Sequence, residues 1–227
     1  MKLEHSAPAG IERASMQIIA AELAQKGIEI PPENRAVVLR AIHASADFDY
    51  ADNLAFTPGA VQAGVAALQK GAAIVTDTNM ALAGLSKPSL AKLGAQAVCY
   101  MADAAVAAEA DRRATTRAAV SMERAMQEHP GAVVAVGNAP TALVRLTELM
   151  QQGARPALVV AVPVGFVNVV ESKQQIFAAC QALGVPCIAA MGARAAPAWR
   201  QPSAMRCCTP QPTRWTLPAA AGNKSRH

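Results

Sequence analysis

Aromatic residues are scarce in this chain of 227 residues, at 4% of the sequence, although 52% of its residues are hydrophobic. A chain of this length and composition can bury one sizeable core and is short for two. Because alanine, valine and leucine supply most of the apolar side chains, we expect a core built from small and branched groups rather than from rings.

The sequence also lacks an apolar run long enough to cross a membrane. The longest run, 156–170, holds two prolines, a glycine and Asn168, so it favours a strand, a turn and a helix start. Near the N-terminus, Glu4 and Glu12 interrupt the pattern of a secretory signal. We therefore expect a cytoplasmic protein with no membrane partner.

Positive charge is concentrated at one end of the chain. The formal net charge is +5, but residues 193–227 hold five arginines, Lys224 and no acidic residue. This leaves 15 basic and 16 acidic residues in 1–192, without a basic stripe that contains aromatic residues. Such a distribution argues against a nucleic-acid partner.

Cysteine and histidine spacing matches none of the common metal sites. The five cysteines form no CxxC, and no paired histidines occur. Cys99, Cys180 and Cys187 lie in apolar stretches, which is typical of buried, reduced thiols. We expect no protein-bound metal.

Short apolar runs alternate with helical stretches over most of the chain, after two N-terminal segments of helical periodicity. This alternation predicts an α/β fold, specifically a flavodoxin-like three-layer α/β/α arrangement with a five-stranded parallel sheet. The expected strands are 73–76, 97–101, 133–136, 158–162 and 185–189, and the expected helices include 60–69, 89–93, 115–127, 140–152 and 172–183. In such sheets ligands bind beyond the carboxyl ends of the strands, which here are 76–78, 137–138 and 163–165.

His43 is the sharpest candidate for chemistry. It follows Ile42 on the apolar face of a predicted helix that begins at Pro32, and acidic residues come soon after it. A histidine can donate or accept a proton near neutral pH. On residue types alone, however, a lone histidine in this setting is more often structural than catalytic.

The segment V-G-N-A-P-T-A-L (136–143) joins a strand end to a helix start. Gly137 permits close backbone approach, and the helix that opens at Pro140 would offer free N–H groups to an anion. Asn138 and Thr141 could add side-chain hydrogen bonds. The alternative is an ordinary loop in which Asn138 caps the helix.

The segment V-P-V-G-F-V-N-V-V-E-S-K (162–173) repeats this arrangement at the next strand end. Gly165 allows a tight turn. Lys173 could meet a ligand carboxylate or pair with Glu171, and the sequence leaves both interpretations open.

Four segments together resemble the precorrin-8X methylmutase family: 41–50, 75–82, 136–143 and 162–173. The resemblance extends from about Ile11 to Gly192. It implies an isomerase that shifts a methyl group between neighbouring ring carbons, converting cobalt-precorrin-8 to cobyrinate or precorrin-8X to hydrogenobyrinate. It further implies a tetrapyrrole substrate with acetate and propionate side chains, a homodimer, and no cofactor, since any cobalt would arrive within the substrate.

The resemblance also implies roles for single residues. His43 matches the family's histidine in the context I-H-x-x-A-D-F-D and would be the catalytic group. Arg117, in A-T-T-R-A-A, could bind a substrate carboxylate, although a solvated helix arginine is the alternative. Asp77 is as likely to cap the following helix as to contact the substrate. The implied substrate-binding residues are Ser15, Thr78, Arg117, Asn138, Thr141, Gly165 and Lys173.

One further choice follows from the resemblance, and two rival functions are weighed against it. The segments T-D-T-x-M-A-L and A-D-F-D favour the cobalt-containing branch of the family over the metal-free branch. A rival function is a carrier that binds a tetrapyrrole without turning it over. A nucleotide binder is disfavoured because no glycine-rich phosphate loop follows the first predicted strand.

Residues 193–227 depart from the family's pattern, which continues with G-R-K-G-G and an alanine-rich apolar helix. Restoring one base in the codon of Gly192 would permit that reading, followed by V-A-A-A-I-C-N-A-L-L, and the single codons of Trp199 and Met205 fit it. We therefore expect 1–192 to form the domain and 193–227 to be an aberrant basic tail produced by a frameshift. An inactive, C-terminally altered methylmutase is then the other alternative, and sequencing of the DNA around codon 192 tests the hypothesis.

Overall fold

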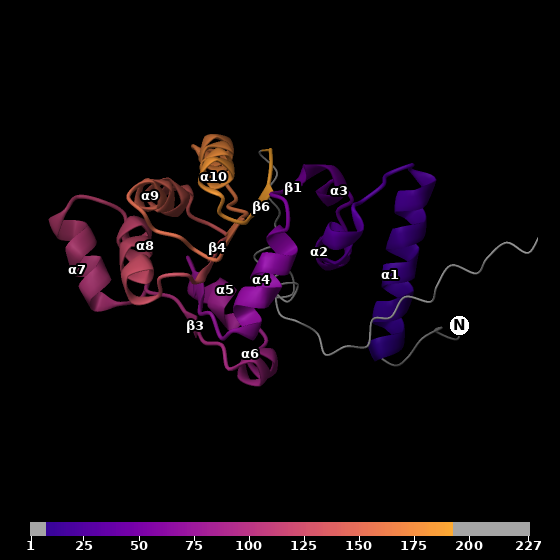
Figure 1. Cartoon of the computed structure of the whole chain (residues 1–227), viewed down its shortest axis with the longest axis horizontal. Coiled ribbons are helices and arrows are strands. Elements are labelled where there is room, and N and C mark those ends of the chain that lie inside the picture. Colours follow the sequence, from indigo (N-terminus) through magenta and orange to yellow (C-terminus); the bar gives the residue numbers. More distant parts are fainter. Residues whose placement is uncertain (1–7, 193–227) are drawn as a thin grey trace, which may run out of the picture.

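A six-stranded mixed sheet forms the centre of the molecule (Figure 1). The computed structural model describes residues 8–192, and within them the strand order is β1-β6-β5-β4-β2-β3. Strands β2 to β6 run parallel, whereas β1 pairs antiparallel with β6. The strands are β1 (Leu54–Phe56), β2 (Ile74–Thr76), β3 (Ala97–Val98), β4 (Val133–Val136), β5 (Leu158–Ala161) and β6 (Cys187–Ala190).

The α/β prediction is confirmed, but the predicted five-stranded, wholly parallel sheet is wrong by one strand. The missed strand β1 has only three residues, Leu-Ala-Phe, with no valine-rich run to mark it. Its pairing continues at Thr57, where the amide of Cys187 donates to Thr57 Oγ1 (2.8 Å) and the amide of Thr57 donates to the carbonyl of Cys187 (2.9 Å). β1 is therefore a strand because it pairs with β6, and not because of its local strand propensity.

Helices cover both faces of the sheet, as the alternating pattern predicted. Figure 1 shows α8, α9 and α10 on one side of the strands and α2 and α4 on the other. The helices are α1 (Pro8–Gln25), α2 (Pro32–Ser45), α3 (Tyr50–Asn53), α4 (Ala60–Gln69), α5 (Asn79–Ala83), α6 (Lys87–Leu93), α7 (Ala104–Arg112), α8 (Arg117–Glu128), α9 (Pro140–Gln151) and α10 (Val169–Leu183).

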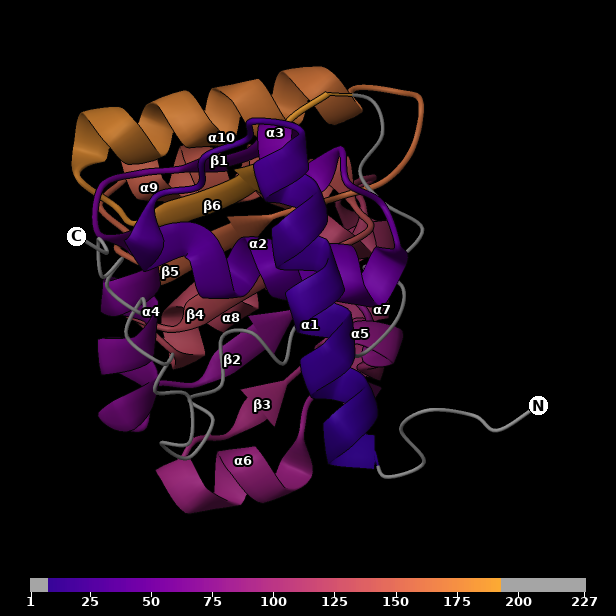
Figure 2. The same ribbon diagram turned by 90° about the vertical axis from the view of Figure 1, so that its right-hand side faces the viewer.

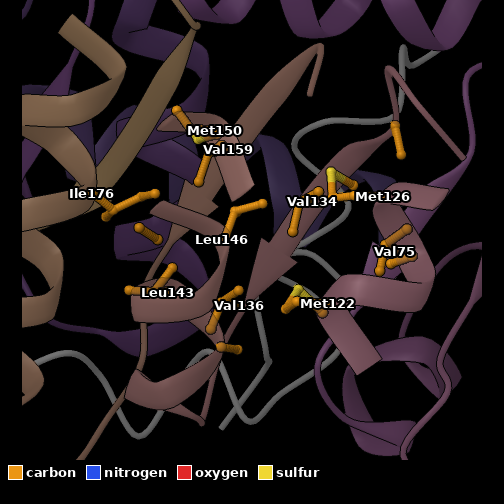
Figure 3. Close-up of a cluster of buried hydrophobic side chains, with 14 of the residues drawn as sticks. Val75, Met122, Met126, Val134, Val136, Leu143, Leu146, Met150, Val159 and Ile176 are labelled. Atoms are coloured by element: carbon orange, nitrogen blue, oxygen red, sulfur yellow. The ribbon is translucent and has the colours of Figure 1, made fainter. Parts of the chain in front are cut away.

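The central strands read as continuous apolar runs because each of their faces is buried under helices. In β4, Val133 and Ala135 belong to the core beneath α2 and α4, whereas Val134 and Val136 belong to the core beneath α8, α9 and α10. Figure 3 shows the second of these cores, which valine, leucine, isoleucine and methionine side chains fill without an aromatic ring among those labelled.

Helix α1 lies outside the three layers. It packs on α2, on the side of α2 that faces away from the sheet (Figures 1 and 2). Its buried side chains Ile19 and Leu23 join the core, and Glu12 forms an ion pair with Arg40 of α2 (2.5 Å). The position of α1 thus depends mainly on one neighbouring helix.

No helix within residues 8–192 is both long and apolar enough to cross a membrane. The predicted aberrant tail, 193–227, lies outside the described residues.

Candidate functional site

His43 and Ser15 meet at the contact between α2 and α1. The Ser15 hydroxyl oxygen lies 2.7 Å from His43 Nδ1, although the two residues are 28 positions apart in the chain. Both side chains are half-buried. A hydrogen bond at Nδ1 fixes the ring orientation and leaves Nε2 as the atom that can exchange a proton with a ligand. Within the described part of the chain, Nε2 has no hydrogen-bond partner.

A hollow of about 360 Å³ opens beside this pair. Its lining is mostly apolar and includes Ile11, Ile18, Ile42 and Phe48 in addition to Ser15 and His43. The imidazole is therefore not sealed within the core but stands at the wall of an open, largely apolar depression. Such a place lets a ring nitrogen reach a bulky ligand with apolar surface.

Asp77 organises the loop between β4 and α9. Its carboxylate is fully buried and accepts backbone N–H bonds from Gly137 (2.9 Å), Asn138 (2.8 Å) and Ala139 (2.8 Å). Burial raises the pKa of Asp77, and the three N–H bonds act in the opposite direction. Asp77 thus serves a neighbouring loop, not the helix that follows it.

This arrangement corrects one prediction for the 136–143 segment. An anion was expected at the N–H groups of the helix start at Pro140, but the N–H groups of the three residues that lead into this helix, 137–139, already bind the carboxylate of Asp77. Sequence reasoning considered Asp77 only as a local cap, because the loop it binds lies 60 residues further along the chain. What remains open to a ligand is the side chain of Asn138, which is exposed.

Thr78 caps α5. Its hydroxyl oxygen accepts the N–H of Ala81 (3.1 Å), which is the cap that had been assigned to Asp77 as an alternative. The Thr78 side chain is half-buried, and its hydroxyl hydrogen has no acceptor among residues 8–192. A ligand at this strand end could still accept that hydrogen.

The starts of α8 and α9 meet through Thr116 and Thr141. Thr116, which caps α8, donates its hydroxyl hydrogen to Thr141 Oγ1 (3.1 Å), and Arg117 is the next residue. Arg117 and Thr141 are both exposed.

Arg117 differs from the arginines around it. Arg112, Arg113 and Arg124 each form an ion pair with a glutamate or aspartate, but Arg117 pairs with no residue that the structure describes. Its guanidinium therefore remains available for a carboxylate that is not part of the protein.

Lys173 is not placed as predicted. Its side chain is completely buried, and Nζ donates to the carbonyls of Ala190 (2.8 Å) and Gly192 (2.9 Å). Burial lowers the pKa of Lys173 to about 8. The lysine does not pair with Glu171 in the described structure, and its ammonium does not face solvent. Contact of Lys173 with a ligand carboxylate stays a prediction. The lysine secures the end of β6 to the first turns of α10.

Gly165 is required by the turn that follows β5. Its φ is 142°, and a Cβ there would lie 3.2 Å from Val169 Cγ2. The chain bends over 165–168, and any side chain at position 165 would be strained.

The predicted residues fall into two groups. Ser15 and His43 form one group at the contact between α1 and α2. Thr78, Asn138 and Gly165 follow β2, β4 and β5 at the carboxyl edge of the sheet, with Arg117 and Thr141 beside them. Ile42, which precedes His43, shares a buried cluster with Ala81 of α5 and Val162 at the end of β5, and this cluster connects the two groups.

A second polar cluster, missed by sequence reasoning, lies at the end of β3. The Tyr100 hydroxyl donates to Glu128 Oε2 (2.6 Å) and lies 2.9 Å from His129 Nε2, and the Arg124 guanidinium stacks 4.7 Å above its ring. Burial and the Glu128 carboxylate raise the pKa of Tyr100 to about 12. These groups pair with one another, so the cluster fastens the loop after β3 to α8.

Within residues 8–192, no group of three or more His, Cys, Asp or Glu side chains could hold a metal ion. The absence of a protein-bound metal or cofactor stays a prediction for the protein as a whole.

Comparison with known proteins gives consistent matches. A profile described as precorrin-8X methylmutase matches residues 10–198. A cobalt-precorrin-8 methylmutase from Priestia megaterium is 41% identical over 170 residues, which cover 74% of this chain and 75% of that protein. A precorrin-8X methylmutase from Pseudomonas aeruginosa is 40% identical over 185 residues, covering 81% and 86% respectively. A crystal structure of precorrin-8x methyl mutase from Thermus thermophilus superposes with a TM-score of 0.77 at 38% identity, covering 88% of this chain and 95% of that one.

Proposed function

Because the chain belongs to the precorrin-8X methylmutase family, and is thus an isomerase of corrin biosynthesis, we propose that His43 is its acid–base group. The observation that carries this proposal is the 2.7 Å contact between Ser15 and His43 Nδ1 at the wall of an open apolar hollow. On residue types alone a structural role for His43 was favoured, and the family resemblance reversed that preference.

The reaction requires the protein to position the substrate and to transfer one proton, and little else. A methyl group moves between neighbouring carbons of the same ring system, so the bond that breaks and the bond that forms both belong to the substrate. His43 Nε2 would give a proton to the macrocycle, or take one from it, near the migrating carbon. Ser15 would hold the ring so that Nε2 faces the ligand, and general acid–base help of this kind contributes about 10²–10⁴ in rate.

The acetate and propionate groups of the substrate need partners at the carboxyl edge of the sheet. Arg117 is the best candidate, because it is an exposed arginine without a described partner. Asn138, Thr141 and Thr78 would add hydrogen bonds from neighbouring loops, and Gly165 would shape the turn beside them. Because residues 1–192 are nearly neutral in charge, the attraction for a polyacid must come from such local groups.

Several properties of this enzyme stay predictions. Relatives named for the cobalt-containing and the metal-free substrates match at 41% and 40% identity, so the motif-based preference for the cobalt branch remains our choice. We also expect a homodimer in the cytoplasm and no resident cofactor. The frameshift hypothesis for 193–227 is unchanged.

The proposed role of His43 is tested by single-turnover conversion of the substrate, followed by absorbance. We expect His43→Ala to lower the rate about 10²–10⁴-fold while it keeps its affinity for the product. Ser15→Ala should lower the rate about tenfold, because the ring loses its orienting bond but Nε2 remains.

Arg112→Ala is the matched control, since Arg112 forms an exposed pair with Glu109 and lies outside both residue groups. It should convert the substrate at the wild-type rate. A His43→Ala protein that converts the substrate as fast as wild type would exclude the catalytic role of His43. A wild type that binds the product but converts no substrate would favour the carrier.

A further inference from the structure

All five large apolar side chains that are exposed among the described residues border the candidate site. Ile11 and Ile18 line the hollow beside His43. Met80 is the second residue of α5, directly after β2, and Phe166 and Val167 lie in the loop between β5 and α10. Their exposed fractions run from 52% for Ile11 to 103% for Phe166. Exposed apolar groups that gather around one site indicate a ligand with apolar surface.

The backbone of the loop between β5 and α10 keeps the Phe166 side chain exposed to solvent. Pro163 and Val169, on either side of the loop, are buried, and Val169 begins α10. Between them, Gly165 has φ 142° and Asn168 has φ 58°. The two residues with positive φ reverse the chain direction between the buried ends of the loop, so that Phe166 lies at the loop's exposed tip.

This tip lies beside the polar part of the site. Strand β5 pairs with β4, and paired strands lie about 4.8 Å apart, so the loop with Phe166 leaves the sheet next to the loop with Asn138. On the other side of β4, strand β2 leads to Met80. The segments that carry these apolar side chains thus lie on either side of the loop with Asn138, and the starts of α8 and α9 meet through Thr116 and Thr141.

We propose that Phe166 packs on the face of the tetrapyrrole ring and that it determines the preference of this site for a planar macrocycle. This inference rests on the proposed function, because the substrate supplies the chemistry that fits: flat apolar faces surrounded by carboxylates. An aromatic ring contacts the face, while Arg117 and Asn138 contact the carboxylates. Met80 and Val167 extend the same apolar contact.

A second copy of the chain is the other possible occupant, and the size of the patch argues against it. A stable interface buries roughly 800 Å² per partner, whereas a fully buried aromatic side chain contributes only about 150–250 Å². Phe166, Val167 and Met80 alone are too few for such an interface. Their placement beyond the carboxyl ends of parallel strands is instead the usual position of a small-molecule ligand.

The test is an absorbance titration of the full chain with cobyrinate, together with steady-state kinetics and sedimentation velocity. The proteins compared are wild type, Phe166→Ala, Phe166→Tyr, and Gln174→Ala as an exposed control on α10. We expect Phe166→Ala to raise the Kd for cobyrinate and the KM about tenfold with kcat little changed. Phe166→Tyr should stay within about twofold of wild type because it keeps the ring, and Gln174→Ala should match wild type.

The outcomes separate this inference from the proposed function. If wild type turns over but Phe166→Ala leaves Kd and KM within twofold, the ring contact is wrong and the function stands. The ring contact is also wrong if Phe166→Ala only dissociates an oligomer without changing affinity. If wild type binds without turnover while Phe166→Ala weakens binding tenfold, the ring contact stands and the catalytic role fails. A wild type that neither binds nor converts overturns both.

Discussion

Lys173 is a cationic side chain with no carboxylate partner in the described structure. Its ammonium is buried and donates to two backbone carbonyls at the end of β6, which replace only part of the hydration it loses. The pKa of Lys173 falls to about 8 for this reason. The cost of burying the charge is therefore present at neutral pH and disappears as the amine loses its proton.

We predict that stability gains a contribution from Lys173 as pH rises. The pKa of Lys173 is about 8 in the folded protein and 10.5 in the unfolded chain. Between these two pH values the unfolded state binds more protons, so folding becomes more favourable as pH rises. Compared with a Lys173→Met variant, wild type should gain about 2–3 kcal/mol in free energy of unfolding across this range. Urea denaturation at several pH values measures it, and parallel curves for the two proteins would contradict it.

The loop between β4 and α9 is held as one element by a residue from another strand end. Three consecutive N–H groups point at the Asp77 carboxylate, so the loop has the form of an anion nest filled by the protein itself. The orientation of Asn138, and the start of the helix that carries Thr141, both depend on that carboxylate. The loop can therefore present its side chains to a ligand without rearrangement.

We predict that Asp77→Asn destabilises the protein by about 2–4 kcal/mol, since an amide NH₂ would face an N–H group that needs an acceptor. The affinity for cobyrinate should fall as well, because Asn138 and Thr141 lose their support. Asp111→Asn, on the exposed surface of α7, is the control and should be neutral within about 0.5 kcal/mol. Denaturation curves and product titrations together provide the measurement, and an unchanged midpoint for Asp77→Asn would disprove the role.

At the level of elements, sequence patterns predicted what depends on local spacing. The parallel strands could be recognised because Val133–Val136 and similar runs are buried on both faces. β1 was missed because its three residues become a strand only through β6. Asp77 and Lys173 were misjudged for a related reason: their partners are backbone groups 60 and 17 or more residues away, and hydrogen bonds of that kind leave no periodic signal.

For the molecule as a whole, the site combines parts of unequal stability. The strand ends belong to a sheet covered on both faces, whereas Ser15 belongs to α1, which packs mainly on α2. Such peripheral elements open at lower free energy than the core.

We predict that urea removes activity before it unfolds the sheet, with an activity midpoint roughly 1 M below the midpoint of the circular dichroism transition. Amide hydrogens of α1 should exchange faster than those of β4 and β5. Coincident midpoints for activity and dichroism would show that α1 and the sheet unfold together. Circular dichroism is a suitable probe, because helices and strands make up most of residues 8–192.

Under the proposed role of His43, its contact with Ser15 links proton transfer to the docking of a single peripheral helix. A ligand that fills the hollow would touch α1 and α2 at once and press the serine against the imidazole. Substrate binding would then stabilise the contact between Ser15 and His43 on which its own conversion depends.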